Sequence, residues 1–483
     1  MAVSQKLNTT LLALLVGTVL VVTACQSSGV DTVDISPPHE YQFERRQGRR
    51  TPVILIPGTL GSRLYNTENG EIAWGNFSAT ISELQDELDL PIDRPRLTQN
   101  RDNLAAYRVL DRAEILLKEG SGEVSFYAEL IDHLSQTLGY RPAYGKRFHR
   151  GHDLFVFFYD WRRSNVEAAT QLREFIESIR RDLRQPKQKF TFLAVSNGGM
   201  IARYYLRYGG RDVVTGHELD EPLNPNWNGL QDCERLICMG TPHVGTIDAL
   251  HLIHDGYAPN VLARRYPPAT IFSFPAAFEL MPEPGEPVFV GEGGESLDID
   301  IWDSDTWEQY GLSVFAESQQ DRLKGEIAET VRPGEDRDVL FNQRMNDQRA
   351  YLELVLKHAH RFRDAIAGEP GVPTEVILGV NTPTLARVGL VRDGEDWQLF
   401  FRPRFPGGRY DPMAEAIYAS GDGVVTRRSG LGLPLPQSSA ELLDRGDNFR
   451  RALSSWTFTP FSHREMFDDQ MLRLTLAETL SEP

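Results

Sequence analysis

Apolar runs and amphipathic stretches alternate along most of this chain. Five short apolar runs lie at residues 52–57, 154–159, 190–195, 235–239 and 375–379. Continuous apolar runs are typical of parallel strands that are buried on both faces. Residues 172–183 repeat apolar side chains at helical spacing, which predicts an amphipathic helix between two of these strands. The alternation therefore predicts an α/β fold with a mostly parallel, doubly wound sheet.

Two long segments interrupt this alternation, at about residues 62–125 and 246–372. The second is rich in Pro, Gly, Trp and acidic residues, and it ends in an amphipathic stretch. Because long excursions from a scaffold usually carry binding function, we expect a lid or membrane contact from the first and a cap from the second. Both belong to one domain over residues 51–483. Trp74, Trp302 and Trp307 fall in these segments, where a tryptophan either contacts lipid or fills the core.

The run at residues 190–195 ends in a serine that is followed by small residues. Ser196 is preceded two positions earlier by Ala194 and followed by Asn197, Gly198 and Gly199. Such a pattern predicts a strained strand-to-helix turn, which exposes a serine hydroxyl and lets the following helix pack close to the strand. Ser196 is therefore our candidate nucleophile.

An acid and a histidine follow in the order that this kind of site uses. Asp422 lies in a glycine-rich turn 226 residues after Ser196, and His463 lies 41 residues further on, after a strand-like stretch at 455–459. His463 would accept the serine proton, while Asp422 would orient the imidazole. Taken singly, Asp422 could cap a turn and His463 could cap a C-terminal helix over about residues 464–478. Their joint order favours the catalytic interpretation.

Acyl transfer also needs two N–H donors for the developing oxyanion. The amide of Asn197 follows the nucleophile, and the turn Pro57-Gly-Thr59-Leu60-Gly follows the first predicted strand. Thr59 is the preferred second donor because it directly follows the glycine. Leu60 and Trp74 are our candidates for contact with substrate.

The N-terminus indicates where the protein resides. Residues 1–24 carry Lys6, no acid and an apolar run shorter than the ~20 residues of a spanning helix, as in a signal peptide. The segment closes on Val-Thr-Ala-Cys25, which resembles a bacterial lipobox with Cys25 as the lipidated residue; an ordinary cleaved signal is the alternative. We expect residues 25–50 to form a flexible tether. We therefore expect a lipid-anchored envelope protein, at the outer membrane and facing the periplasm.

Composition narrows the list of partners. The chain has 483 residues, 41% of them hydrophobic, and a net charge of −17, or −18 without Lys6. An acidic surface argues against nucleic acid and against electrostatic attraction to anionic lipid. Beyond Cys25 the cysteines are Cys233 and Cys238, which we expect as buried thiols rather than a disulfide. No grouping of residues has metal-ligand spacing, so we predict neither a metal nor another cofactor.

Several blocks together resemble a known family. They comprise residues 52–64, the Tyr-Asp-Trp-Arg sequence at 159–162, Ser196-Asn-Gly-Gly, residues 240–245, residues 381–385, residues 421–425 and His463. This set is similar to the lecithin:cholesterol acyltransferase and lysosomal phospholipase A2 family, over roughly residues 50–480. The resemblance implies an α/β hydrolase with a cap and a membrane-contacting insertion. It implies Ser196, Asp422 and His463 as the triad, and Thr59 and Asn197 as oxyanion donors.

The chain departs from the family pattern at some positions. Val195 stands where a histidine is common, and residues 62–125 contain no cysteine for a lid disulfide. We interpret the Tyr-Asp-Trp-Arg sequence as structural, an Asp–Arg pair that stiffens the sheet edge. The resulting hypothesis is a serine acyl hydrolase or acyltransferase that acts on phospholipid or related acyl esters. The alternatives are a carboxylesterase or thioesterase for smaller esters and a non-catalytic lipid-binding lipoprotein.

Overall fold

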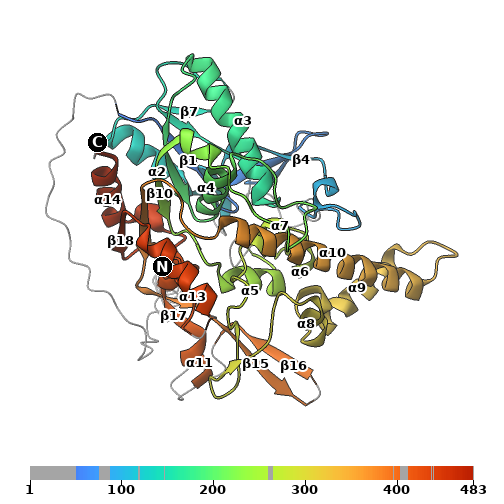
Figure 1. Ribbon diagram of the computed structural model, residues 1–483. Helices are drawn as coiled ribbons and strands as arrows, with labels where there is room; N and C mark the ends of the chain where they lie inside the picture. Colours follow the sequence, from blue (N-terminus) through green and yellow to red (C-terminus); the bar gives the residue numbers. More distant parts are fainter. Residues whose placement is uncertain are drawn as a thin grey trace, which may run out of the picture.

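The central element of the fold is a seven-stranded parallel sheet (Figure 1). The computed structural model describes residues 50–75, 88–117, 120–145, 147–258, 265–394, 396–402, 412–436, 438 and 440–481. Within them the sheet has the order β18-β13-β10-β9-β1-β8-β7, and every neighbouring pair is parallel. Its strands are β1 (Val53–Ile56), β7 (Pro142–Tyr144), β8 (Leu154–Val156), β9 (Phe190–Val195), β10 (Cys233–Met239), β13 (Thr374–Gly379) and β18 (Ser455–Thr459).

Helices cover both faces of this sheet. In β1, Ile54 and Ile56 point into the larger apolar core, which includes residues of α3 (Asn165–Leu183), α4 (Asn197–Tyr208) and α10 (Arg337–Ile366). Val53 and Leu55 point into a second core with α2 (Ala128–Asp132) and α14 (Gln470–Ser481). Alternate side chains are thus buried on opposite faces, which is why the strands appear in the sequence as continuous apolar runs. The predicted doubly wound α/β fold is confirmed.

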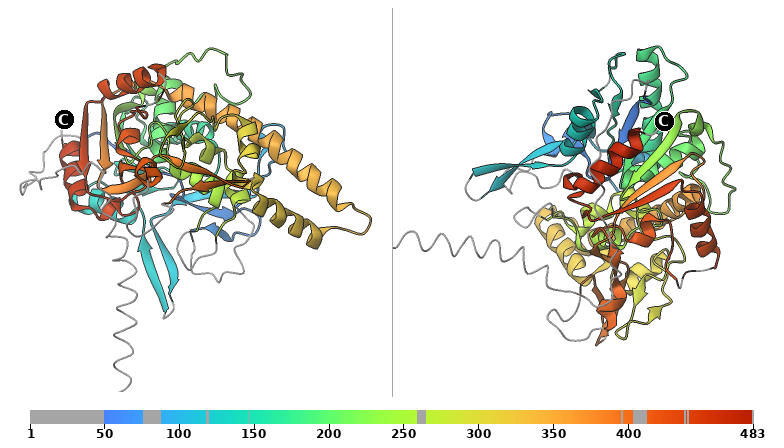
Figure 2. Two further views of the ribbon diagram at one scale, coloured as in Figure 1. Left: turned by 90° about the horizontal axis from the view of Figure 1, so that it is seen from below. Right: turned by 90° about the vertical axis from the view of Figure 1, so that its left-hand side faces the viewer.

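The first long segment leaves the sheet between β1 and β7. It forms a three-stranded antiparallel sheet and a hairpin that projects from the body (Figure 2). The elements are β2 (Ser62–Asn66), β3 (Ile72–Trp74), β4 (Leu104–Val109), β5 (Arg112–Leu117) and β6 (Gly120–Ser125). Its role as a lid or membrane contact stays a prediction.

The second long segment leaves the sheet between β10 and β13 and is mostly helical. Its helices are α5 (Ile247–Asp255), α6 (Pro268–Phe272), α7 (Pro275–Glu279), α8 (Ser304–Gln309), α9 (Glu317–Thr330) and α10. The helices α9 and the first half of α10 extend away from the body as a pair (Figures 1 and 2). The second half of α10 packs on α4 and α7, so one helix joins this segment to the core of the domain.

A further excursion, which the sequence patterns did not predict, lies between β13 and β18. Its strands are β14 (Thr382–Leu385), β15 (Val388–Asp393), β16 (Asp396–Phe400) and β17 (Tyr418–Gly421), with α11 (Pro412–Ile417), α12 (Arg427–Gly430) and α13 (Ala440–Arg451). The strands β15 and β16 join β11 (Phe289–Val290) and β12 (Ser296–Leu297) of the second segment in one small sheet. The two excursions are therefore built together.

Two predicted boundaries are wrong. The strand expected over residues 154–159 ends at Val156, because the chain then turns into the Tyr-Asp-Trp-Arg block. The C-terminal helix begins at Gln470 and not near residue 464. A 3-10 turn over Met466–Asp468 comes first, and the Asp469 carboxylate then accepts the amide hydrogen of Leu472 (2.8 Å), as an N-cap does. His463 consequently does not cap this helix.

Candidate active site

Ser196 occupies a strained turn at the end of the central strand β9. Its backbone has φ 52° and ψ −123°, and α4 begins at the next residue. Positive φ is unfavourable for a residue with a side chain, and such strain is typical of functional turns. The two glycines that follow are required by close packing: a Cβ on Gly198 would lie 2.9 Å from the Pro57 carbonyl oxygen, and one on Gly199 would lie 2.9 Å from the Cβ of Thr241.

The structure brings Ser196, His463 and Asp422 together from three separate loops. His463 Nε2 lies 3.0 Å from Ser196 Oγ, and His463 Nδ1 lies 2.7 Å from Asp422 Oδ2. A carboxylate only accepts, so Nδ1 carries the proton and Nε2 of a neutral ring accepts from the serine hydroxyl. The result is a continuous chain of hydrogen bonds with the polarity that deprotonation of Ser196 requires.

Asp422 is held in place by the turn that follows β17. Its Oδ1 accepts the amides of Val424 (3.0 Å) and Val425 (2.7 Å), which leaves Oδ2 for His463. The backbone repeats this contact, because the His463 amide donates to the Asp422 carbonyl at 2.7 Å. A Cβ on Gly379, at the end of β13, would lie 2.7 Å from the Cβ of Asp422. The carboxylate is thus fixed by its own loop and by a strand end of the central sheet.

Charges around His463 favour its protonated form. Burial is the largest single effect and lowers the pKa of this imidazole, but the Asp422 carboxylate and Asp248 on α5 together raise it by more. Arg464 acts in the opposite direction, and the pKa of His463 lies above its ordinary value. Asp248 thus acts on the site electrostatically. The sequence analysis did not identify Asp248, because an acidic residue in the first turn of a helix is ordinarily explained by its favourable interaction with the helix dipole.

The expected oxyanion donors lie on either side of Ser196. The amide of Asn197 is the first of α4, and first-turn amides have no acceptor within their own helix. On the other side, Gly58 packs so closely that a Cβ would lie 2.8 Å from the Cβ of Ser196. The turn that starts at Gly58 is closed by the Gly61 amide (3.2 Å to the Gly58 carbonyl), so its own hydrogen bond does not use the amide of Thr59.

A buried polar network holds Asn197 and was not found from the sequence. The side-chain amides of Asn165 and Asn197 exchange two hydrogen bonds, of 2.9 and 2.8 Å, and both residues are fully buried. Asn197 Nδ2 also contacts the hydroxyl of Tyr159 (3.3 Å), which in turn donates to the Pro57 carbonyl (3.0 Å). The Ser164-Asn-Val-Glu167 sequence indicates a helix start. It carries no signal that Asn165 faces the nucleophile turn.

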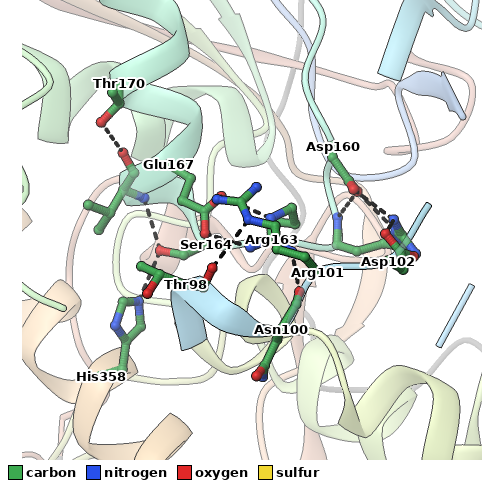
Figure 3. A network of polar contacts seen from close by, with 12 residues as sticks. Thr98, Asn100, Arg101, Asp102, Asp160, Arg163, Ser164, Glu167, Thr170 and His358 are labelled. Atoms are coloured by element: carbon green, nitrogen blue, oxygen red, sulfur yellow. Dashed lines mark hydrogen bonds and ion pairs between the residues drawn. The ribbon is translucent and has the colours of Figure 1, made fainter. Parts of the chain in front are cut away.

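The Tyr-Asp-Trp-Arg block has the structural role that we expected. Arg162 is fully buried and pairs with Asp160 and with Asp102 of the first long segment, as Figure 3 shows around Asp160 and Asp102. Burial lowers the pKa of Arg162, but the two carboxylates raise it by more. Trp161 Nε1 donates to the Ser62 carbonyl at 3.0 Å. The block therefore ties the edge of the main sheet to the first segment.

The candidate substrate residues lie in or next to the turn that contains Thr59. Leu60 is half-buried with φ 65°, and its carbonyl accepts Trp74 Nε1 at 3.0 Å. Trp74 is only 2% exposed, and its ring lies 5.3 Å from that of Trp161. In this structure Trp74 therefore fills the core, which is the second of the two roles expected for it. Trp307 is likewise fully buried, whereas Trp302 is half-buried and donates to the Pro282 carbonyl.

The two cysteines of the folded part of the chain are buried thiols. Cys233 and Cys238 are free and fully inside, as expected, and burial raises the pKa of both thiols.

Among the residues that the structure describes, no group of three or more His, Cys, Asp or Glu side chains is placed to hold a metal ion. Within the same ranges, no helix has the length and apolar character needed to cross a bilayer. The Cys25 region lies outside the described residues.

A parallel sheet with helices on both faces and a serine at a strained strand-to-helix turn defines an α/β hydrolase. The chain belongs to the lecithin:cholesterol acyltransferase family, whose sequence model matches residues 92–430. This confirms the family that the motifs predicted. The matched region contains Ser196 and Asp422, while Thr59 and His463 lie outside it.

The individual relatives that the chain matches share less than 30% of their aligned residues with it. Lysosomal phospholipase A and acyltransferase of Canis lupus familiaris is 28% identical over 184 residues, and that of Homo sapiens 27%; these alignments cover 33% of this chain. The chain spans about two fifths of the length of these curated relatives (43% and 42%). Among solved structures, the Tle4–Tli4 complex has a TM-score of 0.47 at 13% identity, covering 90% of this chain and 98% of that one. Bacillus licheniformis lipase BlEst2 in its propeptide form gives 0.33 at 12%, covering 90% and 51%.

Proposed function

We propose that this protein is a serine-dependent lipid acyl hydrolase or acyltransferase that works through an acyl-enzyme on Ser196. The observation that carries the proposal is the hydrogen-bonded chain from Ser196 through His463 to Asp422. Family membership supports the reaction class. The names of the matched relatives, which act as phospholipase and acyltransferase, support an acyl ester of a phospholipid as the substrate.

In this mechanism Ser196 Oγ attacks the ester carbonyl while His463 takes its proton. The amides of Asn197 and Thr59 stabilise the negative oxygen that forms, and Asp422 stabilises the imidazolium. His463 then returns the proton to the leaving alcohol, which departs as a lysolipid, and the acyl group stays on Ser196. Water or an alcohol, deprotonated by the same histidine, attacks the acyl-enzyme and yields a fatty acid or a new ester.

The test is product analysis on vesicles of phosphatidylethanolamine with labelled acyl chains, with and without a long-chain alcohol. Free fatty acid alone means a phospholipase, and a new ester that grows with alcohol means a transferase. Ser196→Ala is the control and should also lose labelling by a fluorophosphonate. Persistent labelling would place the nucleophile elsewhere. Turnover of small esters without lipid turnover would favour a carboxylesterase, and no Ser196-dependent product would favour a binding protein.

We also propose that lipid on Cys25 anchors the protein in the bacterial envelope, facing the periplasm. The support is the leader-like run that ends at Val-Thr-Ala-Cys25. A single acyl chain binds membranes only marginally, so the multiply acylated cysteine of a lipoprotein would be needed for stable attachment. Radiolabelled palmitate should enter the wild-type chain and not Cys25→Ala, and the variant should leave the membrane fraction. Equal labelling of both would exclude this anchor.

A further inference from the structure

A second polar site lies between α4, α10 and α13, where three arginines gather. Arg203 on α4 is 3% exposed, Arg363 on α10 is fully buried, and Arg445 on α13 is partly buried. Two carboxylates are within ion-pairing distance: Glu283 pairs with Arg363 at 3.1 Å and Asp364 pairs with Arg445 at 3.2 Å. Three guanidinium groups thus share two carboxylates.

Arg203 is the arginine of this group that has no direct ion pair in the described residues, although Glu283 acts on it from a distance. Among the described residues it has no carboxylate within ion-pairing distance; it contacts the carbonyls of Ile366 and Gly368 and the ring of Phe449, 4.4 Å away. Burial first, and the neighbouring Arg363 second, lower the pKa of Arg203 to about 9, which leaves it charged at neutral pH. A buried charge without an ion pair of its own is unfavourable.

His243 adds a further donor to this group. Its Nδ1 lies 3.1 Å from Arg203 Nη1, and a guanidinium can only donate, so Nδ1 accepts. Burial and the two buried arginines hold the pKa of His243 well below its ordinary value, so the ring is neutral. A neutral ring that accepts at Nδ1 carries its hydrogen on Nε2. That N–H is buried and has no partner within the described residues.

These groups line a small cavity. The cavity has a volume of about 10 Å³, and its wall includes Arg203, His243, Glu283, Arg445 and Phe449. The Nε atoms of Arg203 and Arg445 and Nη2 of Arg445 are buried without a partner in the described structure, like Nε2 of His243. The acid on the wall, Glu283, is already paired with Arg363. The cavity is therefore surrounded by an excess of N–H donors and positive charge.

We propose that this cavity is a binding site for a small monovalent anion, with chloride as the physiological candidate. Water would have to direct its two hydrogens at acceptors, whereas an anion accepts from every donor and also neutralises Arg203. The cavity has room for one particle of about the size of a water molecule, so it admits at most a single small ion and excludes a phosphate group. The bound ion would connect α4, which begins next to Ser196, with α10 of the second segment and with α13.

Thermal unfolding of the full chain tests this site. We compare sodium chloride with sodium gluconate at constant ionic strength, because gluconate is too large for the cavity. A ligand that binds the folded state raises Tm, here by roughly 2 °C at a chloride concentration well above its Kd. Arg445→Gln removes two donors and should lose the chloride effect. Arg451→Gln, an exposed arginine on the same helix, is the matched control and should keep it.

Crystals grown in sodium bromide give an independent result on the unmodified protein. Bromide replaces chloride and scatters anomalously, so an anomalous peak should lie in the cavity between Arg203 and Arg445. A peak without anomalous signal would mean water and would overturn the proposal. An equal response of Arg445→Gln and Arg451→Gln to chloride would overturn it as well. Neither experiment measures lipid turnover, so failure here leaves the proposed enzymatic function untouched.

Discussion

Replacing Asn165 by leucine should separate the positioning of the oxyanion donor from the stability of the fold. Leucine has nearly the shape of asparagine but cannot exchange hydrogen bonds with the Asn197 side chain. The change removes two buried hydrogen bonds of 2.9 and 2.8 Å. The Asn197 side-chain oxygen (Oδ1) is then left without a partner, while the side-chain NH₂ group of Asn197 keeps its longer contact with Tyr159. Loss of paired groups and one buried unsatisfied acceptor lower the free energy of unfolding by about 2–4 kcal/mol.

The effect on catalysis follows from what Asn197 does in the proposed mechanism. Its amide donates to the oxyanion, which exists only in the transition state and the tetrahedral intermediate. A donor that shifts by about 1 Å costs on the order of 10²-fold in rate, so kcat should fall by about that factor while KM changes little. Steady-state kinetics on labelled phospholipid vesicles, corrected for the folded fraction from urea unfolding, measures this.

The matched control, Thr170, lies five residues further along the same helix. The single hydroxyl hydrogen of Thr170 lies within hydrogen-bonding reach of the carbonyls of Val166 (3.1 Å) and Gly210 (2.9 Å), and Thr170 has no hydrogen bond to the nucleophile turn in the described structure. Thr170→Val should therefore reduce stability by about 1 kcal/mol and leave kcat unchanged. If Asn165→Leu loses stability as expected but keeps the wild-type kcat, the Asn165–Asn197 pair is structural only and the reasoning is refuted.

Three further predictions concern charged groups. Asp248→Asn removes a negative charge that raises the pKa of His463; the acidic limb of the pH–rate profile should move to lower pH, and an unchanged limb would contradict this. Asp160→Asn leaves Arg162 with one carboxylate and should lower the urea-derived free energy of unfolding by about 3 kcal/mol, without changing kcat of the folded protein. Burial raises the pKa of Glu286 to about 7, so wild-type stability should fall between pH 4.5 and 7, where the folded state holds the proton that the unfolded state has lost. Glu286→Gln should lack that fall in denaturant titrations, and a parallel decline in both proteins would refute it.

The sequence predicts the central sheet well, because burial on both faces leaves a local signature. The strands over residues 190–195 and 455–459 have the bounds that their apolar and β-branched residues indicate. β7 was missed, since an edge strand of three residues has no such run. The excursion between β13 and β18 was missed for a related reason: β15 pairs on one side with β16 and on the other with β11, whose residues lie about 100 positions earlier. No local pattern encodes that pairing.

The same distinction applies to the candidate site. Ser196, Asp422 and His463 were found because each stands at the end of a predicted strand or in a glycine-rich turn, and such positions meet at one edge of a parallel sheet. Asn165 and Asp248 stand in the first turns of helices, where polar residues are ordinarily explained by capping. Their relation to the site depends on how α3 and α5 are placed in space. The burial of Trp74 likewise depends on its contact with Trp161, from another part of the chain.

The buried polar groups also explain how the second segment is fixed to the catalytic domain. Glu279 of α7 is fully buried and accepts the amide of Asn165 (2.7 Å) and the hydroxyl of Ser164 (2.6 Å). Nε2 of His358 on α10 lies 2.8 Å from the same carboxylate and 2.9 Å from the hydroxyl oxygen of Ser164. Figure 3 shows the contact between His358 and Ser164. A carboxylate at a helix N-terminus is favourably placed. The segment is thus attached at the end of α3 that also holds Asn197, so a displacement of α7 or α10 would be transmitted to the proposed oxyanion donor.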